Sequence, residues 1–134
     1  MRLALISLSV VVAAVASAAP PAAIRPDARS RAQTAFERFA ADWMTKVHSL
    51  EAINRANPQV KSGASEPIVT YRGYGDDYDL ELRPTGHAKA PWVGLIRYTE
   101  LLYSCRSVSA TDCSVASSVP VTEVFRYTDG RWTY

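Results

Sequence analysis

The stretch that decides the fold is Asp27 to Asn57, DARSRAQTAFERFAADWMTKVHSLEAINRAN. Its apolar residues recur at the spacing of one side of an α-helix, and polar residues fill the other side. This pattern predicts one long amphipathic helix, which ends at Asn57 because the following Pro58 disfavours helical backbone in the residue before it. The apolar stripe consists of Ala32, Ala35, Phe36, Phe39, Ala40, Trp43, Met44, Val47 and Leu50.

The chain after Pro67 has the pattern of antiparallel strands. Residues Ile68 to Gly73 and Tyr78 to Arg83 are expected to pair as a hairpin across the turn-forming sequence Tyr-Gly-Asp-Asp between them. The longest predicted strand runs from Trp92 to Cys105 and has alternating apolar residues.

A second hairpin is predicted at the C-terminal end, across Asp129-Gly130. A two-residue turn of this composition matches the natural twist of paired strands. In this arrangement Tyr127 faces Trp132 and Phe125 faces Tyr134, so that an aromatic ladder covers one side of the hairpin.

These elements predict an α+β fold: one long N-terminal amphipathic helix packed on a curved four- to five-stranded antiparallel sheet, with residues 27–134 as a single domain. A helix of about 28 residues is roughly 42 Å long. A strand from Trp92 to Cys105 would be about 46 Å long. The two lengths match, so the helix can lie along the sheet.

The N-terminal residues have the pattern of a secretory signal peptide. Arg2 precedes an apolar run of about 13 residues, shorter than the ~20 needed to span a bilayer, and small residues follow it. We expect cleavage near Ala18, which gives a signal peptide at 1–18, a proline-rich extended leader at 19–26 and a periplasmic or secreted protein.

The net charge and the cysteine content limit the classes of partner and of site that the chain can have. The net charge is +2 and falls to +1 without Arg2, so neither nucleic acid nor a stable membrane anchor is expected. In an oxidising compartment Cys105 and Cys113 are expected to form a disulfide. The alternative, a reactive thiol or a metal pair, would need a further ligand nearby that the sequence does not place there.

Two carboxylates are the candidates for chemistry. Alternation along the strands puts Glu100 and Glu123 on the inner face, and they lie opposite each other if Tyr98 faces Phe125. Mutual repulsion would then raise one pKa, as in a general acid and base pair. Alternatively, a bulge near Thr99 turns Glu100 outward, or an arginine such as Arg72 or Arg97 pairs with it.

No cofactor is expected. Asp77, Asp79 and Glu81 share one strand face and could in principle bind calcium, but a solvated face paired with Arg72 or Arg97 accounts for them. The histidines, His48 at the edge of the helix stripe and His87 in a loop, have no companions at metal-ligand or catalytic-triad spacing, and His87 is the better candidate for a contact because loops carry contacts.

The order of one long helix followed by antiparallel strands resembles the cystatin-like and nuclear-transport-factor-2-like folds. Cystatins carry Q-x-V-x-G and Pro-Trp motifs in hairpins, and this chain has Gln59-Val60-Lys61-Ser62-Gly63, with lysine in place of the valine, and Pro91-Trp92. The second family implies a conical cavity, which in some members binds small molecules or supports isomerase or hydratase chemistry.

Three functions remain open, and the third, which the sequence does not separate from the first, is a structural accessory protein without a ligand. The first is a non-enzymatic binding module, an inhibitor- or immunity-type partner of another exported protein, with a contact rim formed by the loops Gly73 to Asp77, Pro84 to Pro91 and Arg106 to Pro120. The second is a ligand-binding cavity, in which Glu100 and Glu123 would carry acid-base chemistry. Its expected lining is Tyr71, Tyr98, Glu100 and Glu123, and a core filled by Phe39, Trp43, Phe125 and Trp132 would exclude it.

Overall fold

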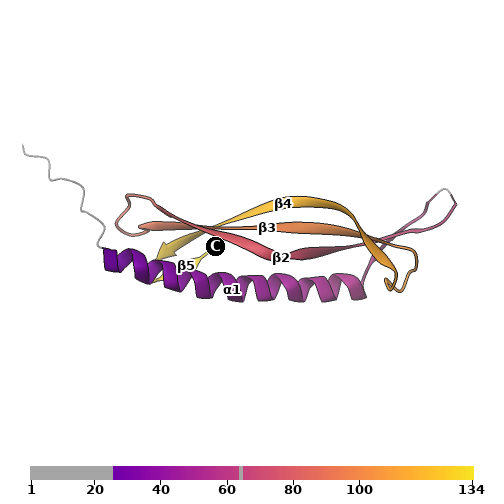
Figure 1. Cartoon of the computed structure of the whole chain (residues 1–134), viewed down its shortest axis with the longest axis horizontal. Coiled ribbons are helices and arrows are strands. Elements are labelled where there is room, and N and C mark those ends of the chain that lie inside the picture. Colours follow the sequence, from indigo (N-terminus) through magenta and orange to yellow (C-terminus); the bar gives the residue numbers. More distant parts are fainter. Residues whose placement is uncertain (1–25, 64) are drawn as a thin grey trace, which may run out of the picture.

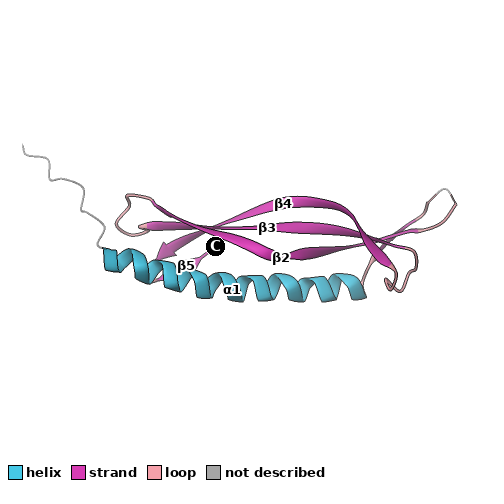
Figure 2. Cartoon of the chain, in the orientation of Figure 1, coloured by secondary structure: helices cyan, strands magenta, loops and turns pink. Residues whose placement is uncertain are grey.

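The computed structural model describes residues 26–63 and 65–134, so the predicted signal peptide at 1–18 and leader up to residue 25 lie outside it. One helix lies along a five-stranded antiparallel sheet whose strand order follows the sequence (Figures 1 and 2). The elements are α1 (Pro26–Ala56), β1 (Gln59–Lys61), β2 (Ile68–Pro84), β3 (Trp92–Cys105), β4 (Cys113–Thr128) and β5 (Arg131–Thr133). The predicted α+β class is confirmed.

The predicted helix is confirmed to within one residue at each end. Its stripe is buried or half-buried from Ala32 to Val47, but Leu50 is 47% exposed and Ile53 is 57% exposed. The prediction that Leu50 belongs to the core is therefore wrong. The physical reason is the path of the helix relative to the sheet, described below.

Aromatic side chains fill the space between α1 and the sheet. The Phe36 ring lies 4.5 Å from the Trp132 ring, and Phe125 lies 4.8 Å from Phe39 and 4.9 Å from Trp43, measured between ring centroids. Gly94 of β3 makes this packing possible, because a Cβ there would lie 2.4 Å from the Phe36 ring.

The predicted hairpin between Ile68 and Arg83 is wrong. Residues Ile68–Pro84 form one long strand, and both of its halves pair with β3, with an irregularity between Tyr74 and Tyr78 where a turn was expected. The Gly-Asp-Asp sequence therefore forms a β-bulge, which adds residues to one strand and increases its local twist.

The helix contacts residues on both faces of this twisted sheet, because Phe36 packs against Trp132 and Arg55 lies over the Tyr71 ring. Ile96 and Tyr98 of β3 belong to the main core cluster, whereas Cys105 belongs to a second cluster that includes Tyr71. Even- and odd-numbered residues of a strand point to opposite faces, so the two clusters lie on opposite faces. The helix passes from one face to the other at the edge of β2, which is why its apolar stripe stops being covered after Val47.

Polar side chains of α1 cap the edge of β2 at this crossing. Glu51 accepts a hydrogen bond from the backbone N–H of Tyr74 (2.9 Å), and Asn54 donates to the carbonyl of Arg72 (3.1 Å). His48 Nε2 lies 3.2 Å from the carbonyl oxygen of Gly75. Spaced three residues apart on one side of the helix, these side chains satisfy backbone groups that no neighbouring strand reaches.

The C-terminal hairpin and the disulfide are confirmed. Tyr127 lies opposite Trp132 across Asp129-Gly130, and both turn residues have positive φ. The disulfide between Cys105 and Cys113 joins the ends of β3 and β4. Among the residues that the structure describes, no helix combines the length and the apolar character required to cross a lipid bilayer.

Candidate binding site

The two candidate carboxylates do not face each other. Glu100 lies opposite Val119, and Glu123 lies opposite Ile96. The expected register, with Tyr98 opposite Phe125, is wrong because Phe125 lies opposite Gly94, the residue that leaves room for the aromatic cluster. The acid-base pair that would have supported catalysis is therefore not formed.

Glu100 has a structural partner instead. Its Oε1 lies 3.7 Å from Nε of Arg72 on the neighbouring strand. A cross-strand ion pair of this kind was the alternative to a catalytic role, and Arg72 was one of the two arginines considered for it.

Glu123 faces the helix, as expected, and binds two phenols. It accepts hydrogen bonds from Tyr98 (3.3 Å) and Tyr134 (2.9 Å). Burial, followed by the negative charge of Glu123, raises the pKa of Tyr98 to about 12, and the hydrogen bond with Glu123 raises the pKa of Tyr134. Both phenols therefore stay protonated near neutral pH and act as donors that hold the carboxylate in place.

Tyr71 does not share a site with Tyr98. It belongs to the cluster on the opposite face, where it stacks on Tyr103 with ring centroids 4.7 Å apart. The Arg55 guanidinium lies 5.5 Å from the centre of the Tyr71 ring, and burial raises the pKa of the Tyr71 hydroxyl. Because aromatic side chains fill the core around Phe125, the expected ligand cavity bounded by Tyr71, Tyr98, Glu100 and Glu123 is absent from the described residues.

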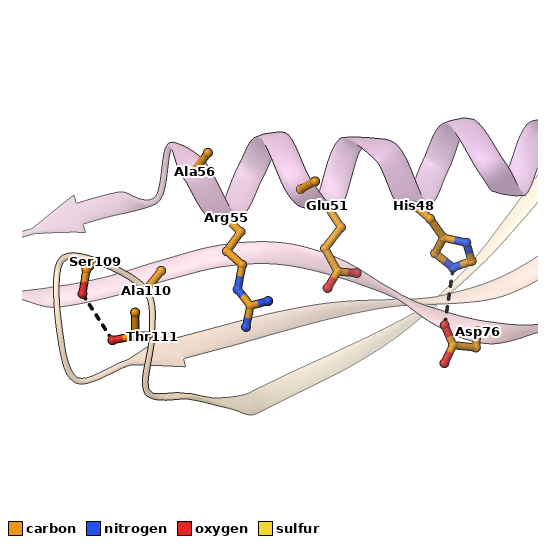
Figure 3. Close-up of a pocket in the computed structure, with 9 residues that line it drawn as sticks. His48, Glu51, Arg55, Ala56, Asp76, Ser109, Ala110 and Thr111 are labelled. Atoms are coloured by element: carbon orange, nitrogen blue, oxygen red, sulfur yellow. Dashed lines mark hydrogen bonds and ion pairs between the residues drawn. The ribbon is translucent and has the colours of Figure 1, made fainter.

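A different hollow lies between the C-terminal half of α1 and the loop that joins β3 to β4 (Figure 3). This cleft has a volume of about 770 Å³ and is open to solvent. We call it the helix–loop cleft. Its lining consists of His48, Glu51, Ala52, Arg55, Ala56, Asp76, Ser109, Ala110 and Thr111.

The loop that forms one wall of the helix–loop cleft is held in place by a disulfide, a buried alanine and hydrogen bonds within the loop. The disulfide closes the loop at its base, where the backbone N–H of Arg106 donates to the carbonyl of Asp112 (3.0 Å). Ala110 is buried in the cluster beneath the cleft and has a positive φ of 51°. The hydroxyls at the loop tip bind one another at 2.9 to 3.2 Å, and they belong to Ser107, Ser109 and Thr111.

Charges follow one another along the cleft. The Arg55 guanidinium lies between the hydroxyl-bearing loop and Glu51, and His48 and Asp76 lie beyond Glu51 (Figure 3). His48 Nε2 is 3.9 Å from Asp76 Oδ1. In the described part of the chain, Arg55 comes within ion-pair distance of no carboxylate. The cleft therefore presents a cation at one end and an acidic group at the other.

The remaining sequence candidates lie elsewhere. Glu81 is hydrogen-bonded to Arg83 and to Arg97 (2.5 Å for the latter), and the bond to Arg83, followed by that to Arg97, lowers the pKa of Glu81 to about 2. The pairing of this strand face with Arg97 is confirmed. His87 is an exposed loop residue. Within residues 26–63 and 65–134, no three His, Cys, Asp or Glu side chains are grouped to hold a metal ion.

The three loops expected to form one contact rim do not do so. The segment Gly73 to Asp77 is part of β2, and the loop after Pro84 lies at the opposite end of the molecule from the loop after Cys105 (Figure 1). Asp76 and the disulfide-closed loop both line the helix–loop cleft, at its opposite ends (Figure 3).

Sequence reasoning missed this cleft, although two signals for it were present. His48, Glu51 and Arg55 recur at helical spacing on one flank of α1, and a serine-rich connection lies between the two cysteines. Their meeting depends on the helix crossing the edge of β2, which no local pattern indicates.

Comparisons of this chain with models of protein families, with characterised proteins and with solved structures give no significant match. The resemblance to cystatin-like and nuclear-transport-factor-2-like folds therefore stays a prediction.

Proposed function

We propose that this chain is an exported, non-enzymatic binding module that engages another exported protein through the helix–loop cleft, as an inhibitor or immunity protein does. The observation that carries this proposal is the disulfide-closed loop that faces the polar flank of α1 across the cleft. A signal-peptide pattern at 1–18 and a disulfide, which persists in oxidising compartments, both support export.

Rigidity supports a binding role. The disulfide, the buried Ala110 and the mutually bonded hydroxyls fix the loop, while the cap on the edge of β2 fixes Glu51. A surface whose side chains are already ordered loses less conformational entropy when a partner binds.

The charge pattern indicates the kind of segment that fits. Arg55, which lies over the Tyr71 ring, can bind a carboxylate with its planar guanidinium, and the loop hydroxyls beside it, whose protons are used in their mutual hydrogen bonds, can still accept hydrogen bonds. Asp76 at the other end favours a basic group. We therefore expect the partner to insert a segment that carries an acidic and a basic side chain.

The geometry gives no support to catalysis at this cleft. A serine nucleophile needs a neighbouring base, but Ser109 is hydrogen-bonded to Ser107 and Thr111, and His48 contacts Gly75 and Asp76. Every polar group in the cleft is hydrogen-bonded within the protein or faces solvent, and this arrangement is typical of a surface that binds another protein.

The test is a pull-down from the exported protein fraction with disulfide-intact protein from residue 19 onwards, read by mass spectrometry. Ser109→Arg places a bulky cation beside Arg55 at the exposed loop tip and should abolish capture of a saturable partner. Ser30→Arg, a change at another exposed serine near the far end of α1, is the matched control and should leave capture unchanged. Equal capture by both variants would rule out this cleft as the binding surface.

A further inference from the structure

The two long edges of the sheet differ in how their backbone groups are covered. Side chains of α1 cap β2, and Asp76, Asp77 and Asp79 add charge along the same strand. At the opposite edge, β5 pairs only with Arg126 to Thr128. The rest of β4, from Ser114 to Phe125, has no strand on its outer side among the described residues.

The open edge also lacks charge. The ten residues from Cys113 to Thr122 read CSVASSVPVT and contain no ionisable side chain other than the disulfide-bonded cysteine. Val119 on this strand is 55% exposed. Natural sheets usually protect an open edge with charged side chains, prolines or bulges, because its unpaired N–H and C=O groups accept another strand; β4 has no charge here, and carries only Pro120 and an irregularity between Val115 and Ser117.

We infer that this edge pairs antiparallel with β4 of a second copy of the chain. This inference does not depend on the helix–loop cleft, which lies between α1 and the β3–β4 loop. Identical strands repel when like charges face each other, and the uncharged segment Cys113 to Thr122 of β4 removes that obstacle to self-pairing.

The position of Pro120 selects the register. Proline has no backbone N–H, so in most self-pairing registers the two copies of Pro120 would interrupt the ladder at two separate places. When the two-fold axis that relates the two copies passes through Pro120, the two prolines lie opposite each other, and the hydrogen-bond ladder is interrupted at one place only. This register uses the seven residues Ser117 to Glu123 and places Glu123 opposite Ser117 of the second copy, so that no like charges meet.

The same register brings valines together. Val119 and Val121 lie opposite Glu100 and Tyr98, two residues apart on β3, so both side chains point to one face. Val119 of each copy then faces Val121 of the other copy, so the dimer contains two equivalent valine pairs. This contact covers Val119, which is 55% exposed in one copy alone, with Val121, which is half-buried against the core of its own copy, and the short ladder gives a weak, concentration-dependent dimer.

Sedimentation equilibrium with the disulfide-intact protein tests the dimer. We expect a monomer–dimer equilibrium that Val119→Lys weakens at least tenfold, because two ammonium groups would then lie beside the axis. Val108→Lys changes a 63% exposed valine in the β3–β4 loop and should leave the equilibrium unchanged. A protein that stays monomeric up to millimolar concentration would overturn the inference, even if β4 accepts a strand from a different protein.

Cysteine cross-linking tests the register. A mixture of Val119→Cys and Val121→Cys proteins should form the mixed disulfide at least tenfold faster than either variant alone links to itself, because only the mixed pair lies directly opposite. Equal rates for the mixed and self-linked species would overturn the register centred on Pro120.

Discussion

The carboxylate of Glu51 holds the backbone N–H of Tyr74 at 2.9 Å, and this hydrogen bond joins the helix to the edge of a strand rather than to the face of the sheet. The contact lies where β2 is irregular and where α1 passes from one face to the other. It therefore stabilises the crossing that brings Arg55 of α1 over Tyr71 of the second core cluster and that forms one wall of the helix–loop cleft.

Glu51→Ala should lower the free energy of unfolding by about 1 to 3 kcal/mol, because it leaves the half-buried N–H of Tyr74 without a partner. Urea unfolding followed by circular dichroism measures the change. Glu37→Ala, at an exposed helical position bonded only to Gln33, is the control and should cost less than about 0.5 kcal/mol. Equal effects would mean that Glu51 has no special part in docking the helix.

Replacement of both cysteines by alanine should destabilise the protein by roughly 2 to 3 kcal/mol, since the disulfide closes a loop with a sequence separation of 8. The same change should loosen the hydroxyl-bearing loop that lines the helix–loop cleft. Urea unfolding measures the first effect and amide hydrogen exchange in Arg106 to Asp112 the second. Unchanged exchange in this loop would show that packing of Ala110 alone fixes it.

Gly94→Ala should cost about 1 to 3 kcal/mol or more, because its Cβ would lie 2.4 Å from the Phe36 ring, at the centre of a filled aromatic core. Gly75→Ala is the matched control in the same sheet, where the nearest atom to a new Cβ is 3.6 Å away. Thermal unfolding of the two variants compares them directly. A Gly94→Ala protein as stable as the control would contradict the proposed role of Gly94 in setting the register of Phe125.

Local patterns predicted the elements that local physics determines. The helix follows from apolar spacing, the strand Trp92 to Cys105 from alternation, and the last hairpin from Asp129-Gly130, whose backbone conformation requires positive φ. The disulfide follows from two cysteines in a chain with an export signal pattern.

Tertiary relationships could not be predicted in the same way. Turn-forming residues at Gly75 to Asp77 became a bulge because β3 is long enough to pair with both halves of β2. Leu50 continues the helical stripe but the twisted sheet no longer lies beneath it. The register that separates Glu100 from Glu123 depends on a fit between Phe36 and Gly94, residues far apart in sequence.

The raised pKa of Tyr98 predicts how stability changes in alkaline solution. An unfolded tyrosine loses its proton near pH 10, whereas Tyr98 in the folded protein keeps it up to about pH 12, because burial and Glu123 disfavour the phenolate. Between these values the folded state binds more protons than the unfolded state, so stability falls as pH rises, by at most about 1.4 kcal/mol per pH unit for this one proton. Below pH 10 the contribution is fully present.

Tyr98→Phe removes the titrating group, so its urea midpoint should fall less steeply between pH 10 and 12 than that of the unmodified protein, although the variant is less stable at pH 7. Tyr78→Phe changes an exposed tyrosine on the neighbouring strand and should leave the slope as it was. Parallel pH profiles for the unmodified and Tyr98→Phe proteins would mean that Glu123 and burial do not hold the Tyr98 proton.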